Sequence, residues 1–285
     1  MHRRRSQDTR GPESLGSLTL YRTVVTDAGL KELTAIKTLT TLDLGSTKIT
    51  DAGLQELAGL PALERLTLNG TQITGVGLKE LAALKKLQSL SLADSKLTDE
   101  GLKALGELES LHSLDLSRTR ITGSGLRELA RLKSLANLTL NFTGLTDSGL
   151  QGLPKWPELQ YLSFHRTAVT DAGLKELSGL SSLEHLTLSS TGVTGSGLRE
   201  LTARKSLQRL ELNSAKVTDE GLKGLAGLAA LEVLDLSGND QVTDAGLKEL
   251  AGLTSLQSLN LASTKVTKAG VEQLKKALPE CQIRN

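Results

Sequence analysis

One segment of the sequence, Leu39 to Ala62, sets the pattern for nearly the whole chain. It carries the spacing Leu-x-x-Leu-x-Leu followed by Thr-Asp-x-Gly-Leu-x-x-Leu-x-x-Leu, and this unit recurs with a period of 24 residues. The copies begin at Leu15, Leu39, Leu63, Leu87, Leu111, Leu135, Leu159, Leu183, Leu207, Leu231 and Leu256. A fixed period of this length predicts a solenoid, in which each coil buries its leucines only against its neighbours.

Each copy divides into two halves. The first half, such as Leu63 to Leu68, alternates apolar and polar residues, which predicts a strand with one buried face. The second half spaces its leucines three apart, as in Leu78, Leu81 and Leu84, which predicts a short helix. Because helices are wider than strands, the stack curves. We expect a right-handed α/β horseshoe with parallel strands on the concave face and short helices on the convex face.

The repeats run from residue 15 to residue 285 and form one predicted domain. A partial copy, Leu278-x-x-Cys281-x-Ile283, closes it. Residues 1–14 are polar and basic and have no periodicity, so we expect a disordered tail there. The solenoid also needs a cap at its N-terminal end, and nothing in the tail is predicted to cover Leu18 or Leu20 of the first coil. Fraying, self-association through this uncapped coil, or a missing upstream part would each account for that.

Residues at the join between strand and helix also repeat. A threonine precedes every helix and aspartate follows it in seven copies, as in Thr50-Asp51; we expect a cap and a favourable helix-dipole charge. A glycine such as Gly53 stands three positions after each threonine. Since glycine inside a helix costs about 0.5–1 kcal/mol, we expect close approach of the neighbouring coil to require it. The ninth position, Thr47 in this copy, is threonine in eight repeats, and we expect its hydroxyl to bond the adjacent coil, with Ala215 breaking that series.

Composition narrows the possible partners. A net charge of +2 gives no electrostatic case for nucleic acid or an anionic membrane. The one cysteine, Cys281, excludes an intramolecular disulfide, and it stands at a core position. No apolar run reaches the roughly 18 residues of a membrane helix, and no apolar segment follows the basic start. We therefore expect a cytoplasmic protein that contacts neither nucleic acid nor membrane.

Residues that could carry chemistry are few. Pairs such as Gly75-Val76-Gly77 begin like a dinucleotide-binding fingerprint but lack its third glycine and are part of the repeat. The histidines are too widely spaced for a local metal motif. Trp156 takes the place of a repeat leucine, and Phe164 does likewise, so both are predicted core residues. We expect no catalytic residue, no cofactor and no metal.

With these residues in view, the chain resembles the leucine-rich-repeat family. Leu231-Glu232-Val233-Leu234-Asp235-Leu236-Ser237-Gly238-Asn239 matches the family's Leu-x-x-Leu-x-Leu-x-x-Asn segment at every fixed position. The Thr-Asp-x-Gly-Leu-Lys-Glu-Leu half resembles the ribonuclease-inhibitor-like branch, including the recognition arms of F-box ubiquitin ligases, although no F-box precedes Leu15. The resemblance implies a non-catalytic scaffold that binds a protein on its concave face. The alternative is the substrate-recognition arm of a larger enzyme assembly.

Strand residues that point out of the core form the concave face, and most of them are small and polar, as a solvated surface would be. Repeats six to nine differ, because larger polar and aromatic side chains gather there on neighbouring strands. Tyrosine and arginine are enriched in binding hot spots, which makes this group the predicted partner site; chance clustering is the alternative. Its residues are Asn137, Asn141, Phe142, Tyr161, His165, Arg166, His185, Arg209 and Glu211.

Overall fold

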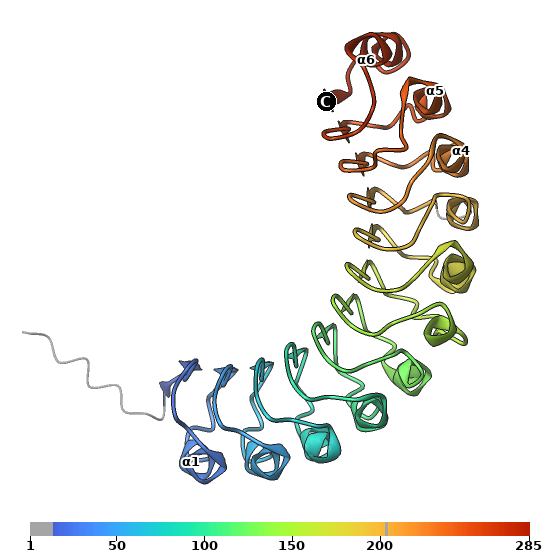
Figure 1. Ribbon diagram of the computed structural model, residues 1–285. Coiled ribbons are helices and arrows are strands. Elements are labelled where there is room, and N and C mark those ends of the chain that lie inside the picture. Colours follow the sequence, from blue (N-terminus) through green and yellow to red (C-terminus); the bar gives the residue numbers. More distant parts are fainter. Residues whose placement is uncertain (1–13, 203–204) are drawn as a thin grey trace, which may run out of the picture.

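The computed structural model describes residues 14–202 and 205–285, so the tail predicted over residues 1–14 lies outside the described residues except for Ser14. The described chain is one curved stack of coils with strands inside and helices outside (Figure 1). Twelve parallel strands form one sheet in chain order, and each pairs with the equivalent residues of the next strand. The predicted horseshoe is confirmed. The strands are β1 Ser17–Thr19, β2 Thr41–Asp43, β3 Arg65–Thr67, β4 Ser89–Ser91, β5 Ser113–Asp115, β6 Asn137–Thr139, β7 Tyr161–Ser163, β8 His185–Thr187, β9 Arg209–Glu211, β10 Val233–Asp235, β11 Ser258–Asn260 and β12 Gln282–Arg284.

The outer segments are short, and many of them are 3-10 helices rather than α-helices. Leucines three apart form one straight stripe on a helix with three residues per turn, so the repeat spacing itself favours this form. The α-helices are α1 Asp27–Leu33, α2 Leu54–Leu57, α3 Leu102–Leu105, α4 Asp219–Leu222, α5 Asp244–Leu247 and α6 Lys268–Lys275. The 3-10 segments are η2 Asp51–Gly53, η3 Val76–Ala83, η4 Asp99–Gly101, η5 Leu126–Arg131, η6 Ser148–Leu150, η7 Asp171–Gly179, η8 Leu198–Leu201, η9 Lys223–Leu225 and η10 Lys248–Leu250.

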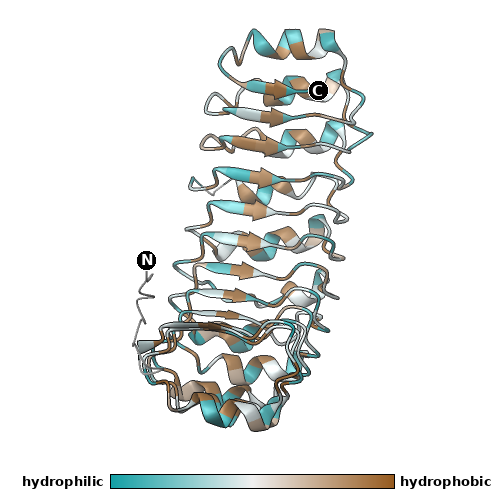
Figure 2. Cartoon of the chain, turned by 90° about the vertical axis from the view of Figure 1, so that its left-hand side faces the viewer, coloured by the Kyte–Doolittle hydropathy of each residue, from teal (hydrophilic) through white to brown (hydrophobic). Residues whose placement is uncertain are grey.

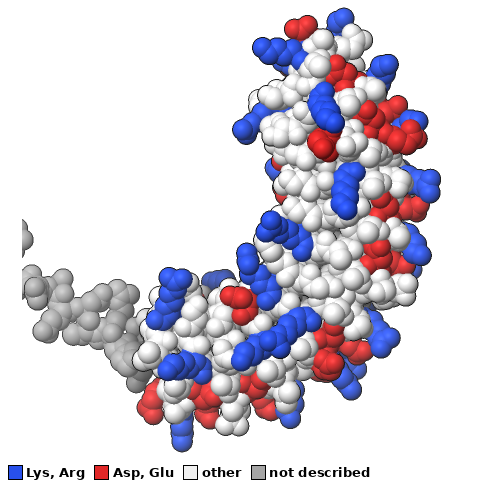
Figure 3. Space-filling view, viewed as in Figure 1, with Lys and Arg blue, Asp and Glu red and all other residues white. Residues whose placement is uncertain are grey.

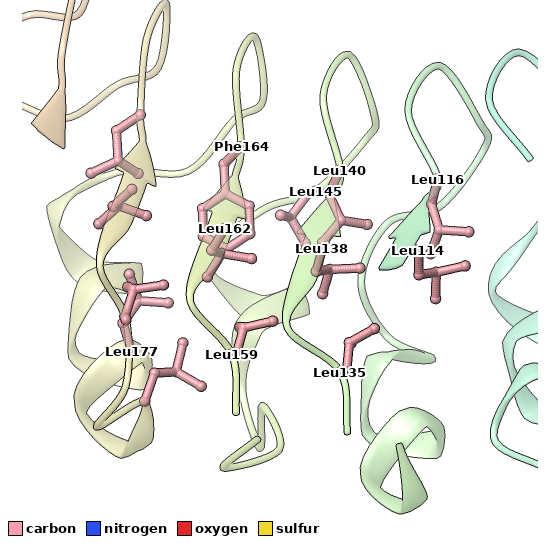
Figure 4. Packing of buried hydrophobic residues seen from close by; sticks show 14 of the residues in the cluster. Leu114, Leu116, Leu135, Leu138, Leu140, Leu145, Leu159, Leu162, Phe164 and Leu177 are labelled. Carbon is pink, nitrogen blue, oxygen red and sulfur yellow. The ribbon is translucent and has the colours of Figure 1, made fainter. Parts of the chain in front are cut away.

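The core runs the length of the stack between the strands and the outer helices. Figure 2 looks onto the concave face, where hydrophobic and hydrophilic residues alternate along the stacked strands. Leucines of neighbouring coils occupy equivalent places, and Phe164 stands where the two preceding coils have Leu140 and Leu116 (Figure 4). Trp156 and Phe164 are fully buried, as predicted. The Trp156 indole N–H also donates to the carbonyl of Leu129 in the preceding coil, at 3.0 Å.

Close contact between coils explains the repeated glycine. A Cβ added at Gly149 would lie 2.1 Å from the carbonyl oxygen of Thr122, and one at Gly77 would lie 2.3 Å from the carbonyl oxygen of Asp51. Gly29 holds the same position in the first described coil, and among the described residues its added Cβ would meet the Val25 side chain of its own coil at 3.4 Å. The predicted close approach is confirmed.

The predicted threonine cap forms in several coils, as where the Thr50 hydroxyl accepts from the Ala52 N–H, but Thr26 and Thr98 make no such side-chain bond. Aspartate after this threonine bonds to the following coil, which the sequence-based expectation of a helix-dipole charge did not include. The Asp27 carboxylate accepts from the Thr50 backbone N–H at 2.9 Å and from the Thr50 hydroxyl at 2.6 Å. Both bonds recur in every coil that has this aspartate, and they tie each coil to its successor. The aspartates are Asp27, Asp51, Asp99, Asp147, Asp171, Asp219 and Asp244.

Three coils have glycine in place of this aspartate, and these glycines have positive φ: 116° at Gly75, 102° at Gly123 and 105° at Gly195. In that conformation Gly195 turns its N–H toward the carboxylate of Asp171, which gathers four donors. They are the Thr194 N–H and hydroxyl at 2.9 and 2.7 Å, the Gly195 N–H at 3.1 Å and the Gly197 N–H at 2.8 Å. A Cβ on Gly195 would lie 2.7 Å from the Cα of Gly221 in the next coil. Only glycine fits where the coils approach backbone to backbone.

Acid should weaken this junction. Burial raises the pKa of the Asp171 carboxyl, but hydrogen bonds from Gly197, Thr194 and Gly195 outweigh burial and hold the pKa below its usual value. A depressed folded-state pKa stabilises the fold above the unfolded-state value of about 3.9, and this contribution disappears as pH falls through the folded-state value. We expect Asp171→Asn to lower the free energy of unfolding by about 1–2 kcal/mol at pH 7, allowing for the partial exposure of the carboxylate.

Urea titrations from pH 7 to pH 2.5 measure this difference. The gap between wild type and Asp171→Asn should shrink below about pH 4, because the wild-type carboxylate is then protonated as well. Asp94→Asn is the matched control, since the Asp94 side chain is exposed and bonds to no other described residue. A gap that stayed constant with pH would show that the charge of Asp171 does not stabilise the fold.

Threonine at the ninth position bonds within its own coil, so the predicted bond to the adjacent coil was wrong. The Thr47 hydroxyl, for example, donates to the Leu44 carbonyl three residues earlier, at 2.6 Å. Asn239 is the residue that crosses between coils: its amide donates to the carbonyls of Leu236 and Leu212, and its Oδ1 accepts from the Val217 N–H. Leu212 stands three residues before Ala215, so Asn239 supplies the bond that Ala215 lacks.

The two ends of the stack differ. In the first coil Leu18 and Leu20 are only partly buried, whereas Leu42 and Leu44 of the second coil are fully buried. At the other end β12 pairs with β11, and the Asn285 amide donates to the Val266 carbonyl at 3.1 Å. No helix among the described residues is long and apolar enough to cross a membrane.

Candidate functional site

The predicted partner residues on β6 to β9 lie side by side on the concave face. Sheet register places Asn137 opposite Tyr161, Tyr161 opposite His185, and His185 opposite Arg209. The Tyr161 and His185 rings meet edge to face, with centroids 6.4 Å apart. We call these four residues the concave patch. Asn137 and Arg209 are exposed, and the two rings between them are half-buried.

Three further predicted residues lie beside the concave patch and bond within the sheet. The Asn141 side-chain oxygen accepts from the Ser163 hydroxyl at 2.6 Å and from the His165 backbone N–H at 2.8 Å. His165 places its ring Nδ1 3.1 Å from the Ser189 carbonyl oxygen. Glu211 accepts from the Thr187 hydroxyl at 3.2 Å and lies 3.9 Å from the Arg209 guanidinium. These bonds hold the side chains in place and leave them less free to meet a partner.

The other two predicted residues, Phe142 and Arg166, stand in the turns that follow the strands, where they join a residue that the sequence did not single out. Arg118 stacks on the Phe142 ring at 4.1 Å from its centroid, and Arg166 approaches the same ring at 5.5 Å. The His165 ring meets Phe142 edge to face at 5.0 Å. We call Arg118, Phe142 and Arg166 the arginine–phenylalanine row. All three hold the eighth position of their repeats, which is the signal that would have found Arg118.

Backbone geometry at the eighth position sets this row in place. Arg118, Phe142 and Arg166 have φ of 55°, 56° and 54°, and their N–H groups donate to carbonyls of the next coil at 2.8 to 3.0 Å. The ladder of hydrogen bonds therefore requires the left-handed conformation. Serine or glycine takes this position in six other coils, whereas a bulky side chain there is uncommon and strained.

Charge is distributed unevenly around the site. Figure 3 shows blue side chains over the broad side of the coils that faces the viewer, while red ones gather mainly over the outer helices. The eighth and tenth positions of the repeats together hold eight basic and two acidic residues. Within the described chain, neither Arg118 nor Arg166 forms an ion pair or a side-chain hydrogen bond. The two guanidinium groups therefore keep free donors.

Features that would support catalysis are weak in the described part of the chain. Residues 14–202 and 205–285 contain no group of three His, Cys, Asp or Glu side chains placed to hold a metal ion. Cys281 is buried, and burial raises the pKa of its thiol despite the nearby Lys275, which disfavours the reactive thiolate. A groove of about 540 Å³ lies on the convex side between α5 and α6, away from the concave patch.

Comparison with known sequences decides the family. Residues 37–97 match one model of the leucine rich repeat, and a second model of the repeat matches residues 107–130, 205–226, 230–251 and 252–275. The chain is a leucine-rich-repeat protein. Leucine-rich-repeat proteins generally mediate protein–protein interactions and are typically non-catalytic as repeat domains. This leucine-rich-repeat chain has no match among curated proteins.

Solved structures with the same fold come from several kinds of organism. An internalin from Listeria monocytogenes is 22% identical with a TM-score of 0.68, and the match covers 96% of this chain and 87% of that one. The mouse RP105/MD-1 complex gives 22% identity and a TM-score of 0.75, over 95% and 47% of the two chains. The ectodomain of the Arabidopsis thaliana receptor kinase GASSHO1/SCHENGEN3, in complex with CASPARIAN STRIP INTEGRITY FACTOR 2, gives 25% and 0.64, over 95% and 32%. These likenesses show the leucine-rich-repeat fold.

Proposed function

We propose that this chain is a non-catalytic scaffold that binds a protein partner on its concave face, at the concave patch. One observation carries the proposal: Asn137, Tyr161, His185 and Arg209 follow one another in register across four strands. Elsewhere that column is mainly serine and threonine. Tyrosine and arginine at the centre of a polar surface are typical of binding hot spots. Two of the similar solved structures are complexes with another protein, which is consistent with this use of the fold.

Two finer proposals accompany it. The Thr-Asp-x-Gly-Leu-Lys-Glu-Leu half, as in Thr170 to Leu177, supports placing the repeats in the ribonuclease-inhibitor-like branch.

The partly buried Leu18 and Leu20 of the first coil support self-association through that coil. Light scattering over a range of concentrations tests the second point: a constant monomer mass at all concentrations would exclude it.

Removing two side chains of the concave patch tests the main proposal. The chain, immobilised, would capture its partner from a lysate of the source organism, and the purified partner would then be titrated against variants. We expect Tyr161→Ala with Arg209→Ala to weaken binding by about 2 kcal/mol or more, roughly thirtyfold in Kd. Alanine offers the partner neither the ring of Tyr161 nor the guanidinium donors of Arg209.

The matched control is Ser89→Ala with Arg65→Ala, which changes the same column on β3 and β4, outside the patch. We expect this pair to leave the Kd within about threefold, or 0.7 kcal/mol. Equal Kd values for wild type and the Tyr161→Ala/Arg209→Ala variant would refute binding at the concave patch. Circular dichroism of each variant confirms that the fold is intact before the titration.

A further inference from the structure

From the arginine–phenylalanine row we infer that the partner presents an acidic segment, whose Asp or Glu carboxylates bind Arg118 and Arg166 at the rim of the concave face. This inference rests on the proposed function and adds the chemistry of the partner. Three observations support it: the position of the row, the unpaired state of its guanidinium groups, and the strained backbone that holds the ring between them.

Position comes first. Phe142 follows β6, Arg166 follows β7, and Arg118 follows β5, so the row borders the strands that carry Asn137 and Tyr161. A segment that crosses the concave patch can continue onto the row without leaving the surface. The concave patch and the row thus form one continuous surface from the β6–β9 strands to the turns beyond them.

Unpaired charge is the second observation. Both guanidinium groups lie over the Phe142 ring, Arg118 at 4.1 Å and Arg166 at 5.5 Å from its centroid. Each guanidinium group presents forked donors that match the geometry of a carboxylate, so an acidic segment that passes the ring can bind both arginines. Two acids on the strands are already engaged: Asp115 accepts from the Ser117 N–H at 3.0 Å, and Glu211 accepts from Thr187. Asp94 holds the eighth position of the coil before Arg118, and among the described residues it forms no ion pair with that arginine.

The third observation is that position 142 carries a phenylalanine in a left-handed backbone conformation. Phenylalanine there has φ of 56°, whereas Ser46, Ser190 and Ser214 meet the same backbone requirement with a small side chain. A strained aromatic residue between two arginines indicates that the ring is kept for recognition rather than for folding. It fixes both guanidinium groups by cation–π contact and reduces the entropy that they would lose on binding.

Fluorescence anisotropy with a labelled poly-glutamate peptide tests the inference, since the natural partner is unidentified. We expect wild type to bind this probe, and Arg118→Gln with Arg166→Gln to weaken the binding about tenfold or more. The control pair, Lys48→Gln with Lys265→Gln, removes the same charge from the tenth position of distant coils and should change the Kd less than about threefold. Failure of wild type to bind, or equal weakening by both pairs, would overturn the inference.

Phe142→Ser separates recognition from folding, because serine is native to this turn in other coils. We expect the variant to bind poly-glutamate more weakly than wild type and to keep a urea midpoint at or above that of wild type. A large fall in the midpoint would show that the ring is structural and would overturn the inference. If the captured partner binds Arg118→Gln/Arg166→Gln as it binds wild type but does not bind Tyr161→Ala/Arg209→Ala, the proposed function stands and the acidic chemistry fails. If it binds both variants as it binds wild type, both the proposed function and the acidic chemistry fail.

Discussion

Gly149→Leu is expected to lower the free energy of unfolding by about 3 kcal/mol or more. A Cβ at this position would lie 2.1 Å from the Thr122 carbonyl oxygen and 3.0 Å from the Cα of Gly123. Both atoms belong to the backbone of the preceding coil, so no side chain can move aside, and the two coils would have to separate. Urea unfolding followed by circular dichroism measures the loss.

Two controls isolate the contact between coils. Lys175→Ala changes an exposed helix residue and should shift the free energy by less than about 0.5 kcal/mol. Gly29→Ala, at the equivalent position of the first described coil, should be tolerated because the added Cβ meets the Val25 side chain at an ordinary 3.4 Å, whereas Gly149→Ala should not be. Equal midpoints for Gly149→Leu and Lys175→Ala would refute the packing explanation for the repeated glycine.

Trp156→Ala is expected to cost about 3–5 kcal/mol, the usual range for removing a buried large aromatic side chain. The ring is fully buried, and its N–H satisfies the Leu129 carbonyl of the preceding coil at 3.0 Å. Coil six has only the three-residue η6 on its outer side, because Pro154 and Pro157 interrupt the helical segment that other coils have. The indole instead bonds to the outer segment of coil five, since Leu129 lies in η5.

Restoring the repeat's usual residue tests whether the ring itself matters. Trp156→Leu should lie between wild type and Trp156→Ala in free energy of unfolding, since leucine fills part of the space but cannot donate to Leu129. The same urea titration ranks the three proteins. A Trp156→Leu variant as stable as wild type would mean that the tryptophan merely substitutes for the leucine of other coils.

Much of the fold could be predicted from the sequence because the 24-residue period repeats the same local pattern. Alternation of apolar residues predicts each strand, and the burial of Trp156 and Phe164 follows from their places in the repeat. The 3-10 character of segments such as η3 was not predicted, although the three-residue spacing of Leu78, Leu81 and Leu84 indicates it.

Hydrogen bonds between neighbouring coils were harder to predict than the secondary structure within one coil. The repeat shows that Asp171 follows a threonine, but not that its carboxylate lies beside Thr194 of the next coil, because that depends on the offset between coils. The same limit led to the wrong partner for the Thr47 hydroxyl.

For the candidate site, the sequence placed the column from Asn137 to Arg209 correctly, since sheet register follows the period. It could not show that Asn141 and His165 are engaged in bonds within the sheet, nor that Arg118 reaches across to Phe142. Those contacts depend on rotamers and on the left-handed turn, which composition and spacing do not determine.

Hydrogen–deuterium exchange on the chain with and without its captured partner tests the central claim most directly. We predict slower exchange in the segments 137–142, 161–166, 185–190 and 209–214, which carry the concave patch and two members of the arginine–phenylalanine row. Exchange in the outer helices, such as α5 and α6, should stay unchanged. Protection of those helices with no change on the strands would contradict binding at the concave face.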